Sequence, residues 1–176
     1  MIRPALPTDT PRLLALTAGT GVFKPYEIDV LEELLDEYHA GALGVEHTAV
    51  VLLSGPPEHP DSIVGYAYYA PDVMTDRSWY LYWIAIDQSR RGSGLGTRVM
   101  QHVEADIRQR QGRLLFIETS SLPHSEPTRR FYLKQGYEIN GQLRDFYSDG
   151  DDMIIFRKRL IPASEPERSR PSDSKV

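Results

Sequence analysis

One stretch, Ser89 to Arg98 (SRRGSGLGTR), constrains the fold most, because it joins a predicted strand to a predicted helix. The segment before it, SWYLYWIAID, is rich in aromatic and β-branched residues, which favour a strand. After it, apolar residues repeat at helical spacing: Leu95, Val99, Met100, Val103 and Ile107. Glycines at alternate positions let a backbone approach a ligand without obstruction from a Cβ atom. The stretch therefore predicts a strand, a glycine loop and a helix in direct succession.

The place of this loop predicts a site for an anion. The first N–H groups of a helix lack intrahelical partners and the helix dipole is positive at that end. Arg90, Arg91 and Arg98 add positive charge that can pair with phosphate oxygens. The spacing matches neither GxGxxG nor a P-loop, since no Gly-Lys-Ser/Thr ending exists. A pyrophosphate would account for these residue types, and a flexible turn with solvated arginines is the alternative.

The remaining segments predict a chain of mixed α and β structure. Strand-like runs are IRPA, TAVVLLSG, SIVGYAYYA, RLLFIETS, YEINGQLRDFY and DDMIIFRKRL. PPEHPD and SDGD are typical of the connections in two hairpins. Three further segments are typical of helices: TDTPRLLALTAG, KPYEIDVLEELLDEYHAG and EPTRRFYLKQG. Several strands in succession before the glycine loop exclude a uniform alternation of strands and helices.

Composition narrows the class of protein. The length of 176 residues suits a single domain, which we place at 1–161, and the Pro-, Ser- and charge-rich residues 162–176 predict a disordered tail. A net charge of -5 argues against nucleic acid as a partner. The absence of cysteine excludes disulfides and a thiol nucleophile, and the histidines lack metal-ligand spacing, so no metal is expected. With neither a signal peptide nor a membrane-spanning run in the sequence, we expect a cytoplasmic protein that does not bind membranes.

Two motifs resemble those of the GCN5-related N-acetyltransferase (GNAT) family. Residues 91–96, RGSGLG, match the R/Q-x-x-G-x-G/A signature, which in that family binds the pyrophosphate of acetyl-coenzyme A. RRFYLKQGYE, from Arg129 to Glu138, resembles the family's F-Y-x-x-x-G-F/Y segment, and the order of elements agrees from Met1 to Leu160. The resemblance implies an α/β (α+β) GNAT fold, with a mixed, mostly antiparallel central sheet flanked by helices. It also implies acetyl-CoA as co-substrate and an N-acetyltransferase activity, with some likeness to the ribosomal-protein N-terminal acetyltransferases.

The same resemblance assigns a coenzyme site. It implies that the backbone of Ile84, Ala85 and Ile86 pairs with the pantetheine arm of the coenzyme. It also implies that one continuous run holds the pyrophosphate through amides and side chains: Arg91, Gly92, Ser93, Gly94, Leu95, Gly96 and Thr97. On the residues alone, 84–86 are buried strand residues, and Thr97 can equally be a simple helix cap.

Acetyl transfer to an amine needs a base for the ammonium proton and an acid for the departing thiolate. Tyr132 stands at the tyrosine position of the second motif and resembles the family's general acid. Glu118 lies near the end of an otherwise apolar strand, where burial can raise its pKa, and is our candidate base. The ribosomal-protein enzymes carry a glutamate at the matching strand. The alternatives are a core tyrosine and a solvent-facing or arginine-paired glutamate.

The acceptor is not specified by the sequence. Tyr80 and Tyr82 alternate on one strand face over which the family's substrate often lies, and sheet packing is the alternative. Asp145 and Tyr147 belong to the region of the acidic turn DFYSDGDD, which could attract a cationic amine or merely be solvated. We predict direct attack by an amine, carried by a small molecule or a protein, in a ternary complex. A non-catalytic acyl-CoA binding or sensing module is the alternative, and the resemblance also implies that a homodimer should be tested.

Overall fold

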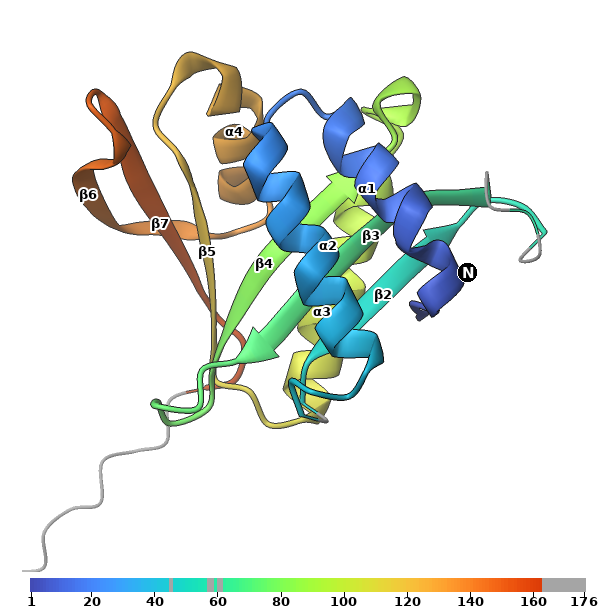
Figure 1. Cartoon of the computed structure of the whole chain (residues 1–176). Helices are drawn as coiled ribbons and strands as arrows, with labels where there is room; N and C mark the ends of the chain where they lie inside the picture. The colour runs from blue at the N-terminus through green and yellow to red at the C-terminus, as the bar shows by residue number, and fades with distance from the viewer. Residues whose placement is uncertain (45, 57–58, 60–61, 163–176) are drawn as a thin grey trace, which may run out of the picture.

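A computed structural model describes residues 1–44, 46–56, 59 and 62–162 (Figure 1). In this part of the chain, a seven-stranded sheet has the strand order β1-β2-β3-β4-β5-β7-β6. Every neighbouring pair is antiparallel except β4 and β5, which run parallel. The predicted fold class is therefore confirmed. Most of the PPEHPD connection and all but one residue of the predicted tail lie outside the described residues.

The bounds of the elements follow the sequence patterns closely. The strands are β1 (Ile2–Pro4), β2 (Thr48–Leu53), β3 (Ile63–Pro71), β4 (Ser78–Ile86), β5 (Leu114–Ser120), β6 (Glu138–Ser148) and β7 (Asp151–Arg159). The helices are α1 (Thr10–Gly19), α2 (Pro25–His39), α3 (Leu95–Gln109) and α4 (Glu126–Lys134), with short 3-10 turns at Pro7–Asp9, Gln88–Arg90 and Pro123–Ser125. No helix of these described residues combines the length and the apolar character that a membrane span requires.

Helices cover both faces of the sheet, with α1 and α2 in front of it and α3 behind it in Figure 1. Alternate residues of β2 therefore belong to different cores. Val50 and Leu52 pack in the core on the α3 side, whereas Ala49, Val51 and Leu53 pack in the core beneath α1 and α2. A strand that is buried on both faces needs a continuous apolar run, which is what TAVVLL provides.

Two irregularities of β4 shape the centre of the sheet. Tyr68 of β3 pairs with Trp83, but Tyr69 pairs with Leu81, so Tyr82 is an extra residue without a partner on β3. The pairing of β4 with β5 ends at Leu81 and Ile117, and beyond this point the two strands diverge (Figure 1). The second half of β4 therefore has β3 on one side and an opening on the other.

A buried ion cluster connects α3 to the last strand. The Glu104 carboxylate is 7% exposed and accepts hydrogen bonds from Lys158 Nζ at 2.7 and 2.9 Å, from Arg108 at 2.9 Å and from the Tyr137 hydroxyl at 3.1 Å. Lys158 Nζ also donates to the backbone carbonyl of Gln135 at 2.8 Å, at the end of α4. This cluster thereby holds the C-terminal end of α4 against the sheet.

Candidate active site

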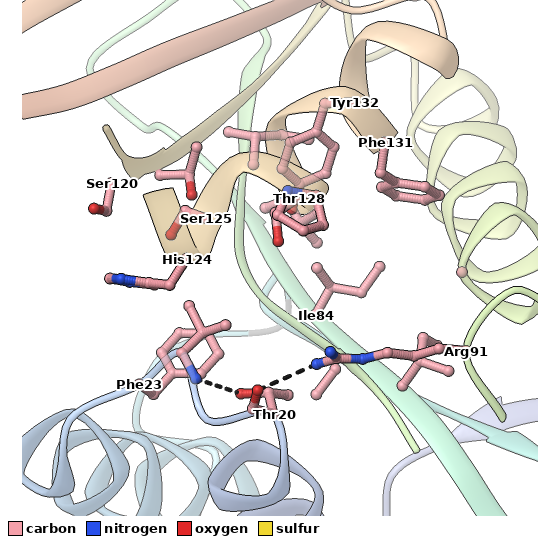
Figure 2. Close-up of a pocket in the computed structure, with 18 of the residues that line it drawn as sticks. Thr20, Phe23, Ile84, Arg91, Ser120, His124, Ser125, Thr128, Phe131 and Tyr132 are labelled. Carbon is pink, nitrogen blue, oxygen red and sulfur yellow. Dashed lines mark hydrogen bonds between the residues drawn. The ribbon is translucent and has the colours of Figure 1, made fainter. Parts of the chain in front are cut away.

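A cavity of about 750 Å³ occupies the opening between β4 and β5. Its walls come from both strands, the glycine loop with the first turn of α3, α4, and the connection between α1 and α2. In Figure 2, Thr128, Phe131 and Tyr132 of α4 lie on one side of the cavity, while Phe23 and Arg91 lie on the other. Segments far apart in the sequence thus meet at the point where the sheet opens.

The glycine loop adopts a conformation that requires glycine. Gly92 and Gly94 both have φ angles of +80°, in the left-handed region that L-residues with a side chain rarely adopt. Gly96 has a different reason to lack a side chain, because a Cβ atom there would lie 3.3 Å from the ring of Phe131. The first two glycines therefore set the path of the backbone, and the third allows α3 to pack against α4.

This path leaves a group of backbone donors free. Arg98 N–H makes the first intrahelical bond of α3, to the carbonyl of Gly94 at 3.1 Å. Within the described residues, no hydrogen bond uses the N–H groups that precede it at the helix start: Gly92, Gly94, Leu95, Gly96 and Thr97. Together with the positive end of the helix dipole, these free donors suit the binding of an anion, and we refer to them as the candidate anion site.

Arginine side chains border this anion site. Arg91 reaches across the cavity and donates to the backbone carbonyl of Thr20 at 3.2 Å (Figure 2). Arg90 donates to the hydroxyl of Ser54 at 2.8 Å. Neither guanidinium forms an ion pair with a carboxylate of the described residues, so their charges remain available to an anion. Ser93 donates to the carbonyl of Arg90 at 2.5 Å, and the Thr97 hydroxyl accepts from Gln135 at 3.0 Å, so both side chains have partners within the protein.

The strand that leads into the loop has one open edge. Ile84, Ala85 and Ile86 pair with Ala67, Tyr66 and Gly65 of β3. On their other side β5 has already diverged, and the three residues line the cavity. Backbone groups at such an edge can pair with an extended ligand that carries amide groups, as a further strand would.

Tyr132 lies at the centre of the cavity wall formed by α4. It is 3% exposed, and its ring packs against Phe131, Tyr137 and Phe156 with centroid distances of 5.5, 5.9 and 5.5 Å. Burial raises the pKa of the phenol well above its usual range, so the hydroxyl keeps its proton at neutral pH. Its hydroxyl has no hydrogen-bond partner among the described residues, although the residue lines the cavity.

Glu118 is the first residue of β5 beyond the last pair with β4, and its side chain faces the cavity. Burial raises the pKa of this carboxyl above its ordinary value. No arginine or lysine of the described residues forms an ion pair with it. The carboxylate is thus accessible from the cavity and without a fixed partner, which are the properties a proton acceptor needs.

The residues expected to contact the acceptor divide into two groups. Tyr80, Tyr82 and Tyr147 line a second cavity of about 320 Å³, which adjoins the first at Glu118. Asp145 lines neither cavity: its carboxylate accepts a hydrogen bond from Gly150 N–H at 2.7 Å within the β6–β7 hairpin. Asp145 is therefore placed where it supports the turn.

Several lining residues were not expected from the sequence. Phe23 and Glu27 enter both cavities from the start of α2, Ser125 is fully buried at the start of α4, and Asp151 accepts a hydrogen bond from Ser120 at 2.5 Å. The first two lie in the stretch GTGVFKPYEI at the entry to α2, which in the sequence carries no readable code for an acceptor. In the described part of the chain, no group of three or more histidine or acidic side chains is arranged to hold a metal ion.

Comparison with known proteins identifies the family to which this chain belongs. The family model of the acetyltransferase (GNAT) domain matches residues 46–139. A solved GNAT-family acetyltransferase structure from Desulfovibrio desulfuricans is 38% identical, with a TM-score of 0.83 over 92% of this chain and 99% of that one. The chain therefore belongs to the GNAT family, and the protein is an acetyltransferase.

More distant relatives carry specific names. The 5-NmdU N-acetyltransferase of Pseudomonas phage PaMx11 is 24% identical over 158 residues, 90% of this chain and 98% of its own length. The ribosomal-protein-S18-alanine N-acetyltransferase from Escherichia coli shares the fold, with a TM-score of 0.68 at 17% identity over 94% of this chain and 96% of that one.

The GNAT family uses acetyl-CoA, and the residues described above fit that group. The unpaired N–H groups at the start of α3, with Arg90 and Arg91, suit a pyrophosphate. The open edge of β4 at 84–86 suits the amide-containing arm of the coenzyme, and it leads from the glycine loop towards Tyr132 and Glu118.

Proposed function

We propose that the protein transfers an acetyl group from acetyl-CoA to a primary amine by direct attack in a ternary complex. Acetyl-CoA supplies the acetyl group as an activated thioester. The observation that carries the proposal is the meeting of an accessible carboxylate, Glu118, and a buried phenol, Tyr132, in one cavity with the glycine loop. The absence of cysteine from the chain supports direct attack over a cysteinyl acyl-enzyme.

The donor is held along one wall of the cavity. We assign the pyrophosphate to the free N–H groups of the loop and to Arg91, and the pantetheine arm to the open backbone edge of Ile84, Ala85 and Ile86. Because these contacts are made by backbone groups fixed in a strand and a helix start, they orient the thioester without a large loss of side-chain entropy.

Proton movements are assigned to two residues. Glu118 accepts a proton from the ammonium group of the acceptor, directly or through a water, and its raised pKa brings it nearer to the pH at which the enzyme works. The amine nitrogen then forms the C–N bond while the C–S bond breaks. The Tyr132 hydroxyl, which stays protonated because burial raises its pKa, donates its proton to the departing sulfur, and its oxygen takes up the second proton that the nitrogen loses as the amide forms.

The test is the turnover of acetyl-CoA with a broad amine panel, with Tyr132→Phe measured beside the wild type. Loss of a general acid reduces kcat by about 10²- to 10⁴-fold, while the dissociation constant of acetyl-CoA stays near the wild-type value. Tyr137→Phe is the matched control, because Tyr137 packs against Tyr132 but does not line the cavity. Unchanged turnover in Tyr132→Phe would remove the general-acid role. Acetyl-CoA binding without turnover of any amine would favour the acyl-CoA binding or sensing module.

A further inference from the structure

The second cavity, of about 320 Å³, lies beside the donor cavity on the side of α2. Six residues line both cavities: Phe23, Glu27, Leu81, Tyr82, Glu118 and Tyr147. A molecule in the second cavity would therefore reach the candidate base directly. If the proposed function holds, the walls of this cavity determine which amine can approach.

Aromatic rings make up most of these walls. The register shift of β4 turns both Tyr82 and Trp83 towards the α2 side, where their rings lie nearly parallel, with centroids 6.4 Å apart and an interplanar angle of 29°. Tyr82 is also 5.9 Å from Tyr80, which stacks on Phe116 at 5.5 Å. The Tyr82 ring is held in place by these neighbouring rings. Because Tyr82 is 48% exposed, its ring also remains accessible to a ligand.

The opposite wall comes from the start of α2 and from β6. Phe23, Tyr26 and Val30 contribute apolar surface, and Tyr26 is 57% exposed. Tyr147 closes the cavity on the side of β6. A flat molecule would therefore contact aromatic or aliphatic surface on both of its faces.

The charge around this cavity is negative. Glu27 and Glu118 are the carboxylates that line it, and no lysine or arginine is among its lining residues. Glu27 also accepts a hydrogen bond from the backbone N–H of Lys24 at 2.6 Å. Burial raises the pKa of Tyr82, and the negative charge of Asp72 acts in the same direction. Burial raises the pKa of Tyr147 to about 12, and the negative charges of Glu118, Asp151 and Glu27 act in the same direction. These carboxylates therefore face a common region, in which an ammonium group would be stabilised.

We propose that the acceptor is a compact monoamine whose ammonium group is carried by a planar ring, such as an arylalkylamine or an aminomethyl-substituted heteroaromatic compound. This inference rests on the proposed function. The ammonium lies between Glu27 and Glu118, and the ring stacks on Tyr82. A polyamine or an aminoglycoside would place additional cations against the side chains of Tyr26, Val30 or Trp83, which carry no charge. A peptide would bring its main chain as well as its amine into a cavity whose lining, apart from the two carboxylates, is aromatic or aliphatic.

A matched amine panel tests the class of acceptor. 2-Phenylethylamine and 2-cyclohexylethylamine have the same skeleton, but only the first has an aromatic face. We expect kcat/KM to favour the aromatic amine by about tenfold to a hundredfold, the range expected when a single ring gains a stacking partner. Spermidine, kanamycin and an alanine tripeptide represent polyamines, aminoglycosides and protein N-termini, and each should be a poorer substrate than 2-phenylethylamine.

Substitutions at Tyr82 connect this preference to the cavity. Tyr82→Leu keeps an apolar side chain without an aromatic face, and should bring the ratio of the two kcat/KM values close to one. Tyr82→Phe keeps the ring and should keep the preference. Melting temperatures establish that each variant folds, and Tyr26→Ala, at an exposed position of α2, removes the opposite wall if Tyr82→Leu does not fold.

The outcomes separate this inference from the function on which it rests. Better turnover of spermidine, kanamycin or the tripeptide than of 2-phenylethylamine would overturn the proposed acceptor class and leave the acetyltransferase mechanism standing. A ring preference that survives both Tyr82→Leu and Tyr26→Ala would also overturn it. If acetyl-CoA binds but no amine in the panel is acetylated, the proposed function fails, and this inference fails with it.

Discussion

The substitution Gly94→Ala tests the glycine loop with a defined structural perturbation. Gly94 has φ of +80° and ψ of +1°, and no atom lies within 4 Å of the position that a Cβ would take. Alanine would therefore meet no steric clash with neighbours, and its whole effect would arise from the backbone conformation. A left-handed conformation costs a non-glycine residue roughly 1–2 kcal/mol.

The strain can be relieved in two ways, and both are measurable. If the loop keeps its shape, the free energy of unfolding falls by that amount, and the melting temperature by about 2–8 °C for a domain of this size. If the loop relaxes instead, the N–H groups of Gly94 and Leu95 turn away from the pyrophosphate. Each hydrogen bond lost to a charged group is worth about 1.5–3 kcal/mol, so the dissociation constant of coenzyme A should rise at least tenfold.

Gly41 provides a matched control. It follows the C-terminal end of α2 with φ of +72°, has no atom within 4 Å of a Cβ position, and lines neither cavity. Gly41→Ala should therefore lower the melting temperature by a similar amount without changing the affinity for coenzyme A. Thermal denaturation and isothermal titration calorimetry measure the two effects. Unchanged coenzyme A affinity together with an unchanged melting temperature in Gly94→Ala would refute this account of the loop, because the backbone strain must appear in one of the two measurements.

Two further predictions concern carboxylates. Because burial raises the pKa of Glu118, its contribution to stability is present below the unfolded-state pKa and is lost as the pH rises through the folded-state pKa. Glu118→Gln should therefore not lower the melting temperature at pH 7, while the acidic limb of the pH profile of kcat/KM should disappear; a retained limb would place the base elsewhere. Glu104→Leu leaves the Lys158 ammonium, which is 23% exposed, without its counter-charge. We expect the free energy of unfolding, measured in urea, to fall by about 2–4 kcal/mol, which is less than for a fully buried ion pair because Lys158 is partly exposed. Adding Lys158→Met should recover most of it, and equal losses in the single and double variants would contradict this account.

The elements of the fold could be predicted because each has a local signal. The apolar spacing in α3, the continuous apolar run in β2 and the glycine at Gly136 after α4 all depend on residues close in the chain. The location of the anion site could be predicted for the same reason, since a strand, a glycine loop and a helix follow one another directly. Motifs that resemble a family then predict which anion it is, the pyrophosphate of acetyl-CoA.

The acceptor side could not be predicted in the same way, because it depends on contacts between distant segments. The run YLYW suggests simple alternation, in which Tyr82 and Trp83 would point to opposite faces of the sheet. The shift of register against β3 places both on the α2 side instead. Similarly, Asp145 and Glu27 each accept a hydrogen bond from a nearby backbone N–H, and nothing local shows that Glu27 also lines both cavities whereas Asp145 lines neither.

The register shift at Tyr82 and the divergence of β5 after Ile117 together explain why donor and acceptor sites meet where they do. The divergence frees the backbone edge of 84–86 for the donor, and the shift places the Tyr82 ring on the acceptor side. Glu118 is the first residue of β5 past the last pair, and Tyr82 is its counterpart on β4, so the candidate base lies where the two cavities join. A change that extended regular β4–β5 pairing would therefore close the donor edge, whereas a change that removed the register shift against β3 would displace the Tyr82 ring. It follows that the proposed donor and acceptor sites depend on two neighbouring irregularities of β4, and six of the ten residues that line the second cavity also line the first.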